Sequence, residues 1–315
     1  MRIKKALCLM LVLVLGFLMA CSKGGQADPT PVPYEGNTTM YQLPESTPNR
    51  LQMMSYVIQT KDNKIIVLDG GNEGDTEYFL DFLKDLTKVD KPHVDHWFLS
   101  HAHSDHTDVF TKVIEDDTVT ISNVYHHFPP VEDVDRYERV EVHTIKRINA
   151  AFELIKDKTE IHEVQVGDRI TIGSVEVEVL FVYMPEIKSG FLNNSSTVFR
   201  FHVEGTSILF LGDLGYEAGD ILLQCYGDDL KSDIVQMAHH GSNGVRYNVY
   251  NKIAPKICLW PTPDWLWNND QGKGYNTGPW ETITLHKYMI KLGVETHYVS
   301  KDGLISIVFP LDETN

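Results

Sequence analysis

The chain has 315 residues, of which 42% are hydrophobic and 23% are charged, so it can bury a sizeable core. Its formal net charge is −16 at pH 7, and no cluster of Lys and Arg follows the first few residues. Because an acidic body repels polyanions, this composition disfavours a long nucleic acid as substrate or partner.

The N-terminus has the pattern of an export signal. A basic start precedes an uncharged apolar run at residues 6–19, which is too short to span a bilayer comfortably. The run leads into Leu-Met-Ala-Cys, which resembles a bacterial lipoprotein cleavage box and makes Cys21 the expected site of lipid modification. We therefore predict a signal peptide at residues 1–20 and an extracytoplasmic protein that is lipid-anchored to a bacterial membrane. A plain signal peptide followed by a chance cysteine is the alternative.

Residues 21–37 are rich in Gly, Pro, Ser and Asp, which is typical of a flexible tether. No internal repeat or further linker follows, so residues 38–315 are expected to form one domain. Two cysteines remain in that domain, Cys225 and Cys258. They are either a disulfide formed in an oxidising compartment or two small buried residues, and the sequence leaves both interpretations open.

The domain mixes strands and helices. Apolar alternation and short apolar runs predict strands at residues 52–59, 65–69, 96–100, 120–125, 175–183, 197–203, 207–211, 233–238 and 256–260, with two more near the end of the chain. Helical spacing predicts helices at residues 75–86, 131–156, 216–225 and 280–292. Two β-rich halves with helices outside them suggest an α/β protein with an αββα sandwich.

The strongest motif is His-Ala-His-Ser-Asp-His at residues 101–106, directly after a predicted strand. Imidazole and carboxylate groups are ordinary ligands of zinc and similar metals. His101 and His103 lie two residues apart, so in an extended segment their side chains point to the same side. Asp105 and His106 lie one step further along a turn and can face a second ion. A solvated histidine-rich loop is the alternative interpretation.

Three other strand ends carry residues of the same chemistry. Asp69 precedes Gly-Gly, Asp213 ends a Leu-Gly-Asp run, and His239 and His240 follow a third strand. Delivery of carboxylates and imidazoles from separate strand ends is how a rigid scaffold builds a site. Asp69 either supports the histidine-rich loop or is simply a turn residue.

Together these motifs resemble the metallo-β-lactamase superfamily, whose hallmark is the HxHxDH loop. Asn-Asn-Ser-Ser at 193–196, Leu-Gly-Asp at 211–213 and His-His-Gly-Ser at 239–242 are similar to the hydrolase domain of competence DNA-uptake (ComEC-like) proteins. They are also similar to the catalytic module of secreted phosphorylcholine esterases. The resemblance covers roughly residues 50–310 and implies the αββα sandwich of the metallo-β-lactamase fold.

The resemblance also implies a centre of two divalent metal ions, with zinc expected and manganese or iron as alternatives. Its ligands would be His101, His103, Asp105, His106, Asp213 and His239. Asp213 would bridge both ions, and Asp105, Asp213 and His240 would be the catalytic residues. We expect His239 to be the ligand because it directly follows the apolar strand, which leaves His240 to contact the substrate; the reverse assignment stays open.

The chain departs from the family where many members carry a further histidine in a Gly-His-rich turn. Five histidines lie in that interval, and none has this setting: His126, His127, His143, His162 and His202. Asn193 or Asn194 occupies roughly the expected place, so the first ion would keep positions for water or a substrate oxygen. Asn194 is the residue that we expect to contact the substrate.

Four of the five tryptophans lie between residues 260 and 280, among Gly, Pro and Asn residues that indicate a loop. We expect Trp265, Trp267 and Trp280 to bind substrate, either by caging a quaternary ammonium group or by stacking on a ring. The alternative is a loop that covers the edge of the sandwich with a small core of its own.

These inferences predict a lipid-anchored binuclear hydrolase that acts outside the cytoplasm. Its expected substrate is a small-molecule or cell-envelope phosphoester, either a phosphodiester or a phosphocholine ester. Three alternatives remain: a ComEC-like nuclease, another hydrolase such as a lactonase or β-lactamase, and a lipoprotein that holds metal without turnover. The acidic charge counts against the nuclease, and the absent third histidine counts against a β-lactamase.

Overall fold

The structure is a computed structural model that describes residues 34–44 and 53–311. The predicted signal peptide, Cys21 and the predicted tether up to residue 33 lie outside the described residues. None of the described helices combines the length and the apolar character that crossing a membrane requires.

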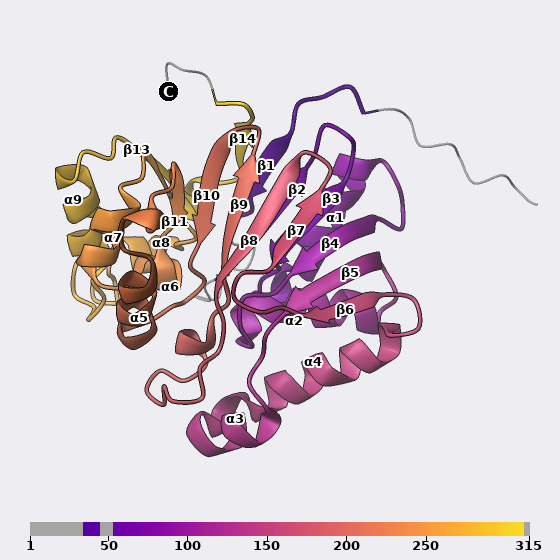
Figure 1. Cartoon of the computed structure of the whole chain (residues 1–315), viewed down its shortest axis with the longest axis horizontal. Helices are drawn as coiled ribbons and strands as arrows, with labels where there is room; N and C mark the ends of the chain where they lie inside the picture. The colour runs from indigo at the N-terminus through magenta and orange to yellow at the C-terminus, as the bar shows by residue number, and fades with distance from the viewer. Residues whose placement is uncertain (1–33, 45–52, 312–315) are drawn as a thin grey trace, which may run out of the picture. The chain divides into compact units, whose positions relative to one another are not determined.

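Two sheets make up the centre of the described chain (Figure 1). The first has the order β14-β1-β2-β3-β4-β5-β6, and the second has the order β13-β12-β11-β10-β9-β8-β7. The strands of the first sheet are β1 (Thr39–Gln42), β2 (Ser55–Gln59), β3 (Ile65–Asp69), β4 (His93–Phe98), β5 (Thr120–His126), β6 (Glu160–Glu163) and β14 (Ile305–Val308). Those of the second are β7 (Arg169–Ile172), β8 (Val175–Phe181), β9 (Val198–Val203), β10 (Thr206–Phe210), β11 (Ile234–Gln236), β12 (Ile257–Trp260) and β13 (Thr296–Val299).

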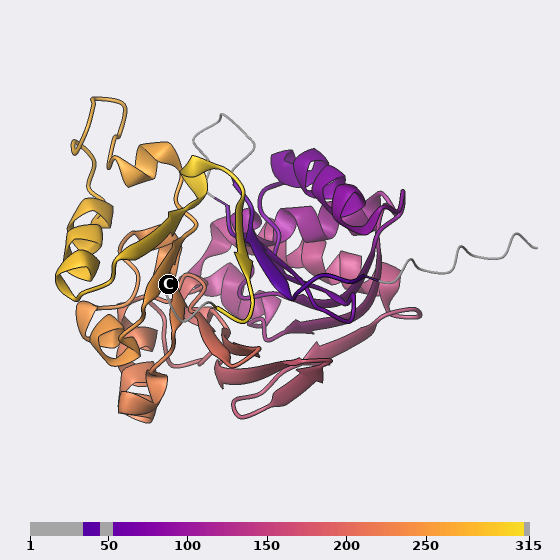
Figure 2. The same ribbon diagram turned by 90° about the horizontal axis from the view of Figure 1, so that it is seen from above.

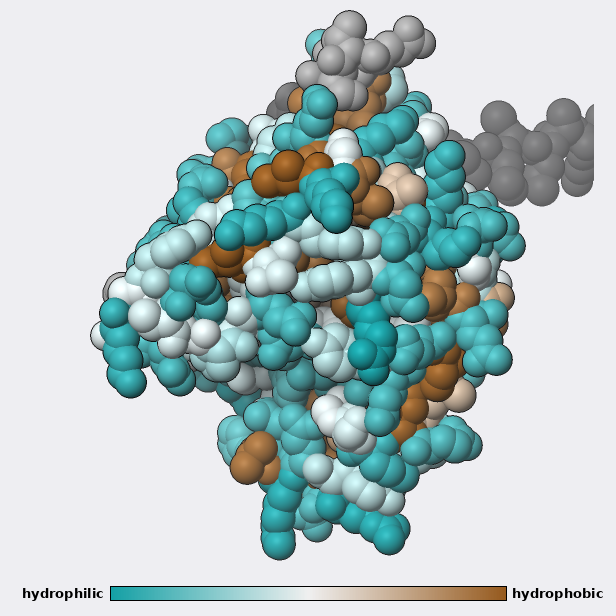
Figure 3. Space-filling model, turned by 90° about the vertical axis from the view of Figure 1, so that its left-hand side faces the viewer, coloured by the Kyte–Doolittle hydropathy of each residue, from teal (hydrophilic) through white to brown (hydrophobic). Residues whose placement is uncertain are grey.

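Helices cover the outer face of each sheet (Figures 1 and 2). The first sheet carries α1 (Thr76–Thr87), α2 (Ser104–Glu115) and α4 (Val142–Ile155), and the second carries α5 (Tyr216–Tyr226), α7 (Tyr247–Ile253) and α9 (Thr282–Lys291). The side of the molecule that bears the second group is largely hydrophilic, as expected of an outer helical layer (Figure 3). This arrangement confirms the predicted αββα sandwich.

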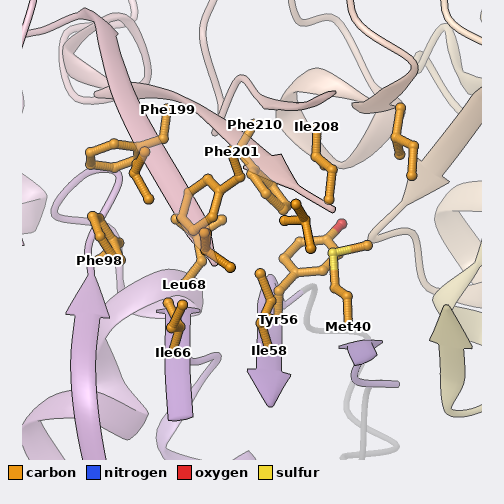
Figure 4. Close-up of a cluster of buried hydrophobic side chains, with 14 of the residues drawn as sticks. Met40, Tyr56, Ile58, Ile66, Leu68, Phe98, Phe199, Phe201, Ile208 and Phe210 are labelled. Atoms are coloured by element: carbon orange, nitrogen blue, oxygen red, sulfur yellow. The ribbon is translucent and has the colours of Figure 1, made fainter. Parts of the chain in front are cut away.

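The two sheets meet through an aromatic core, which Figure 4 shows in close-up. Period-two alternation along β9 turns Phe199 and Phe201 inward and Arg200 outward. The ring centroids of Phe98 and Phe201 lie 5.2 Å apart, and those of Tyr56 and Phe210 lie 5.0 Å apart, both in edge-to-face packing. Each such buried ring contributes about 1.5–3 kcal/mol, so this core fixes the two sheets against each other and with them the strand ends.

Most predicted strands and helices are confirmed with shifted ends, but one prediction is wrong. Residues 131–156 form two helices, α3 (Val131–Tyr137) and α4, with a short 3-10 turn between them. The chain leaves helical geometry at Glu138, whose φ and ψ are −146° and 58°. The apolar spacing hides this break, because Val134 and Ile145 on either side of it pack into the same cluster.

The two cysteines of the domain do not pair. Cys225 lies exposed on α5, whereas Cys258 lies buried on β12, and both are free thiols. The structure therefore has two unpaired cysteines and no disulfide between them, and of the two only Cys258 is buried.

Buried histidines should make the fold acid-sensitive. Burial lowers the pKa of His126 to about 4, and its ring packs on Phe128 and Phe152 with centroids 4.8 and 4.7 Å away. An unfolded histidine has a pKa of about 6.5, so the stability due to the neutral ring is complete above that value. It is lost as the pH falls towards 4. Replacing His126 with Phe keeps the ring and removes the proton site, so we expect the melting temperature to fall less between pH 7 and pH 5.

The measurement is thermal unfolding of both proteins at the two pH values. An equal fall in the two proteins would show that His126 takes no part in acid sensitivity.

Candidate metal centre

The candidate ligands follow strands whose carboxyl ends reach one rim of the sandwich. Residues 101–106 follow β4 of the first sheet, Asp213 follows β10 of the second, and the pair 239–240 follows β11. Strands β4, β10 and β11 each lie in the parallel part of their sheet. Parallel strands deliver loops to the same edge, which is where α/β proteins build their sites.

Two groups of side chains at this rim could each hold a metal ion. One is His101, His103 and Asp213, and the other is Asp105, His106, Asp213 and His240. Within each group the candidate ligand atoms lie within 4.8 Å of one another, and Asp213 belongs to both. Of the six predicted ligands, the structure therefore brings five together, and His240 completes the set.

The second group is buried and its ligand atoms lack hydrogen-bond partners. This holds for one oxygen each of Asp105 and Asp213 and for Nε2 of His106 and His240. His240 Nε2 lies 3.1 Å from Asp105 Oδ2 and 3.3 Å from Asp213 Oδ2. Buried polar atoms are normally hydrogen-bonded, so four unpartnered atoms around one point fit a divalent cation that binds imidazole and carboxylate.

Hydrogen bonds made by Nδ1 determine that Nε2 of His106 and of His240 faces the centre. His106 Nδ1–H donates to Asp69 Oδ2 at 2.7 Å, and His240 Nδ1–H donates to the Pro261 carbonyl at 2.9 Å. Each bond leaves Nε2 pointing at the shared carboxylates. This is the arrangement in which an imidazole serves as a metal ligand.

The charges of the centre shift the pKa values of its groups. Burial disfavours protonated imidazole, but Asp213 and its neighbouring carboxylates overcome it and raise the pKa of His240 to about 9. The pKa of His106 is raised well above its ordinary value for the same reason. Burial, together with neighbouring His106, holds the pKa of His101 well below its ordinary value. The carboxylates thus attract positive charge, which a metal ion would supply in place of protons.

The choice of His239 as the ligand is not supported by the geometry. His239 Nε2 lies 3.9 Å from Asp213 Oδ2, and 29% of its side chain is exposed, whereas His240 is fully buried in the second group. Both residues have left-handed backbone conformation, with φ of 53° and 54°. A side chain at Gly241 would collide with the ring of Trp260, so the chain turns tightly here and carries the second histidine inward.

Asp69 lies behind the histidine-rich loop. It is completely buried, its Oδ1 accepts the Ser100 N–H at 2.7 Å, and its Oδ2 accepts the Ser100 hydroxyl and His106. These contacts favour the supporting interpretation over that of a simple turn residue, because they set the direction of the loop and of one candidate ligand.

Two polar residues that the sequence analysis missed hold the other ligand loops. Gln236 accepts the Leu211 N–H and donates to the Gly212 and Met237 carbonyls, which ties the loop after β10 to the loop after β11. Ser196 Oγ accepts the Asp213 N–H at 3.0 Å. In the sequence, Ser196 stands out only through the family resemblance of the Asn-Asn-Ser-Ser run. Gln236 lies in an apolar strand, so nothing in the sequence indicates its role.

Glu138 is the third residue that the sequence analysis missed. Its Oε1 accepts the Nε2–H of His103 at 2.9 Å, and its Oε2 accepts the Leu192 N–H at 2.9 Å. His103 Nδ1 therefore faces His101 Nε2, 3.0 Å away, as expected of two ligands of one ion. The break between α3 and α4 is what brings this carboxylate to the centre.

Asn194 lies in the wall of the cavity beside Asp213 and is held there by the scaffold. It is 95% buried, its side-chain oxygen accepts the N–H groups of Gly215 and Ala218, and its side-chain nitrogen donates to the Ser189 carbonyl. These bonds anchor the start of α5, so the amide serves the scaffold. In the neighbouring Asn193, the side-chain oxygen is buried and has no hydrogen-bond partner.

The tryptophan loop favours the packing interpretation. Trp267 lies edge to face against Trp260, with centroids 5.3 Å apart, and Trp265 lies against Trp280 at 4.9 Å. In the described part of the chain, none of these rings lines the cavity beside Asp213. The rings pack on one another, as the alternative interpretation expects, and a substrate contact of Trp265, Trp267 and Trp280 stays a prediction.

A profile of the metallo-β-lactamase superfamily matches residues 48–255, which is more than half of the chain. The chain belongs to the metallo-β-lactamase superfamily. Its members are mostly metal-dependent hydrolases and usually bind two metal ions. A search of curated proteins gives no match.

Several solved structures are similar to the chain at low sequence identity. The metallo-β-lactamase fold protein YhfI from Bacillus subtilis is 12% identical, covering 86% of this chain and 100% of that one, with a TM-score of 0.50. CmlA, a diiron β-hydroxylase from Streptomyces venezuelae, is also 12% identical, covering 90% and 55%, with a TM-score of 0.49. A diphosphatase from the PhnP family is 13% identical, covering 87% and 98%, with a TM-score of 0.48. At such identities the likeness concerns the fold alone.

The two neighbouring histidines should differ in their effect on metal content. We expect the His240→Ala variant to lose the ion of the second group and the His239→Ala variant to keep the wild-type content. Asp213→Ala should weaken both sites, because this carboxylate belongs to both groups. Metal content after gel filtration, measured by plasma mass spectrometry, checks all three. Loss of metal from His239→Ala alone would restore the assignment made from sequence.

Glu138 should support metal binding without being required for folding. Glu138→Gln keeps the shape but weakens the acceptor for His103, so we expect metal affinity to fall by about 10- to 100-fold. Competition with a chromogenic chelator measures this affinity. Glu141→Gln, in the adjacent 3-10 turn, is the control and should bind metal like the wild type. Unchanged affinity in Glu138→Gln would contradict the supporting role.

Proposed function

We propose that this protein is a binuclear metal-dependent phosphoesterase, with zinc as the expected metal. The observation that carries the proposal is Asp213, which two groups of buried histidines and aspartates share. Two divalent ions at such a centre make water nucleophilic near neutral pH and neutralise the charge of a phosphoryl group. His101 and His103 with Asp213 would hold one ion, and Asp105, His106, His240 and Asp213 would hold the other.

The remaining residues of the rim bind and orient the substrate. His239 lines the cavity next to Asp213, and burial lowers the pKa of its ring, so it is a neutral donor and acceptor at pH 7. It can donate a hydrogen bond to a phosphoryl or leaving-group oxygen. The first ligand group offers only three protein ligands, which leaves room for a substrate oxygen. Glu138 and Asp69 keep the ligand rings in place.

The setting of the enzyme is proposed from its N-terminus. The signal-like segment and Cys21 support a lipid-anchored protein that works outside the cytoplasm on a small-molecule or cell-envelope phosphoester. The net charge of −16 disfavours long nucleic acids, so a ComEC-like nuclease is the less favoured candidate.

A panel of chromogenic esters tests the proposal. The metal-loaded protein without residues 1–33 should hydrolyse bis-p-nitrophenyl phosphate, p-nitrophenyl phosphate or p-nitrophenyl phosphorylcholine. Residue 34 is chosen as the start because the described domain begins there. Activity should disappear in Asp213→Ala, because that variant removes the carboxylate shared by both groups.

Single-stranded DNA and a β-lactam complete the panel. Preference for DNA would favour the nuclease, and cleavage of the β-lactam would favour another hydrolase class. Bound metal with no cleavage of any compound would favour a binding protein and sink the phosphoesterase proposal.

A further inference from the structure

A small cavity opens beside the metal centre. It has a volume of about 280 Å³, and its wall includes Asp213, Tyr216, Glu217, His239 and Arg246. This space suits the head group of a small ester. Because Asp213 and His239 form part of its wall, a bound group would extend directly from the reacting phosphoryl group.

Arg246 is the single Lys or Arg among the residues that line the cavity. It lies six residues after His240, at the start of α7, and its side chain is about half exposed. Its Nε–H donates to Asp220 Oδ2 at 3.1 Å. Among the described residues, the two terminal nitrogens have no hydrogen-bond acceptor, so the fork that binds carboxylates and phosphates is available.

The position of Arg246 is fixed by packing on α5. Its guanidinium lies over the ring of Tyr216, with the central carbon 4.6 Å from the ring centroid. Val245 packs so closely against Gly219 that a side chain at 219 would collide with it. The segment after the two histidines is therefore held against α5, and the guanidinium of Arg246 lies close to the cavity wall.

The same contact argues against a quaternary ammonium ligand. Tyr216 is the one aromatic residue in the wall of this cavity, and Arg246 already covers its ring. A cation that packed on the Tyr216 ring would meet the guanidinium at short range and would be repelled. Negative charge opposes this preference: Asp213 and the exposed Glu217, in the first turn of α5, lie in the wall, and Asp220 pairs with Arg246. These carboxylates weaken the attraction for anions.

We propose that Arg246 binds a second anionic group of the substrate. The inference rests on the proposed phosphoesterase function and narrows its substrate class. The preferred substrate is a small phosphoester that carries a carboxylate or a further phosphate a few bonds from the scissile phosphoryl group. The phosphocholine ester, one of the two kinds of ester that the sequence analysis expects, is disfavoured.

Three phosphonates of similar size separate these substrate classes without turnover. They are 2-carboxyethylphosphonate, propylphosphonate and 2-(trimethylammonio)ethylphosphonate, titrated calorimetrically into the metal-loaded wild-type protein. We expect the carboxylate compound to bind about two- to fivefold more tightly than the propyl compound, which is typical of a half-exposed arginine–carboxylate pair. The ammonium compound should bind the least tightly.

Variants assign the preference to Arg246. In Arg246→Gln the carboxylate compound should bind no better than the propyl compound, and Arg246→Lys should keep part of the preference. Glu217→Gln should increase the preference. Lys252→Gln is the matched control, because Lys252 is another half-exposed cation on α7, paired with Asp228 at 2.6 Å and outside the cavity wall.

The outcomes are distinguishable. Equal binding of the carboxylate and propyl compounds in the wild type, or a preference that survives in Arg246→Gln, overturns the anionic subsite while the phosphoesterase proposal stands. Tightest binding of the ammonium compound overturns it in favour of a choline-like head group. A protein that binds no phosphonate and cleaves no ester fails the proposed function itself.

Discussion

Three carboxylates packed into the rim of the sandwich set the constraint on which this structure depends. Asp69 and Asp213 are at most 1% exposed, and Asp105 is mostly buried. A buried charge without a partner costs several kcal/mol, so each needs a compensating group. Asp69 has the Ser100 N–H and hydroxyl and His106. Asp105 and Asp213 face imidazole nitrogens that lack hydrogen-bond partners, and this concentration of negative charge is stable only with protons or a metal cation between the groups.

The surrounding fold holds these carboxylates close together. Gly212 has a φ of +56°, and a side chain there would crowd Ser196 and Ser100, so the loops of the two sheets approach closely at this point. Gln236 ties the loop after β10 to the loop after β11. The aromatic core holds the two sheets against each other. Glu138, at the break between α3 and α4, contacts His103 of the centre. The centre is thus rigid before any ligand arrives, which is what a preorganised site requires.

The sequence predicts those parts of this centre that depend on local pattern. Residues 101–106 and Asp213 follow apolar strands, and the spacing of His101 and His103 alone places both rings on one side. The distinction between His239 and His240 depends instead on a left-handed turn set by the ring of Trp260, which is distant in sequence. The sequence leaves the role of the tryptophan loop open, because aromatic residues in a loop look alike whether they cover one another or bind a ligand. The role of Glu138 could not be predicted, because the apolar spacing typical of a helix continues across the break between α3 and α4.

The two halves of the centre differ in a way that bears on its chemistry. The second group supplies four protein ligands, whereas the first supplies two imidazoles and the shared carboxylate. Asn194 is hydrogen-bonded to the start of α5 and belongs to neither group. If both groups hold a metal ion, the ion of the first group would have fewer protein ligands and would therefore be the one that a substrate oxygen can bind. The cavity with Arg246 also opens at Asp213, so a substrate held at both points would present its phosphoryl group to the centre and its second charge to the arginine.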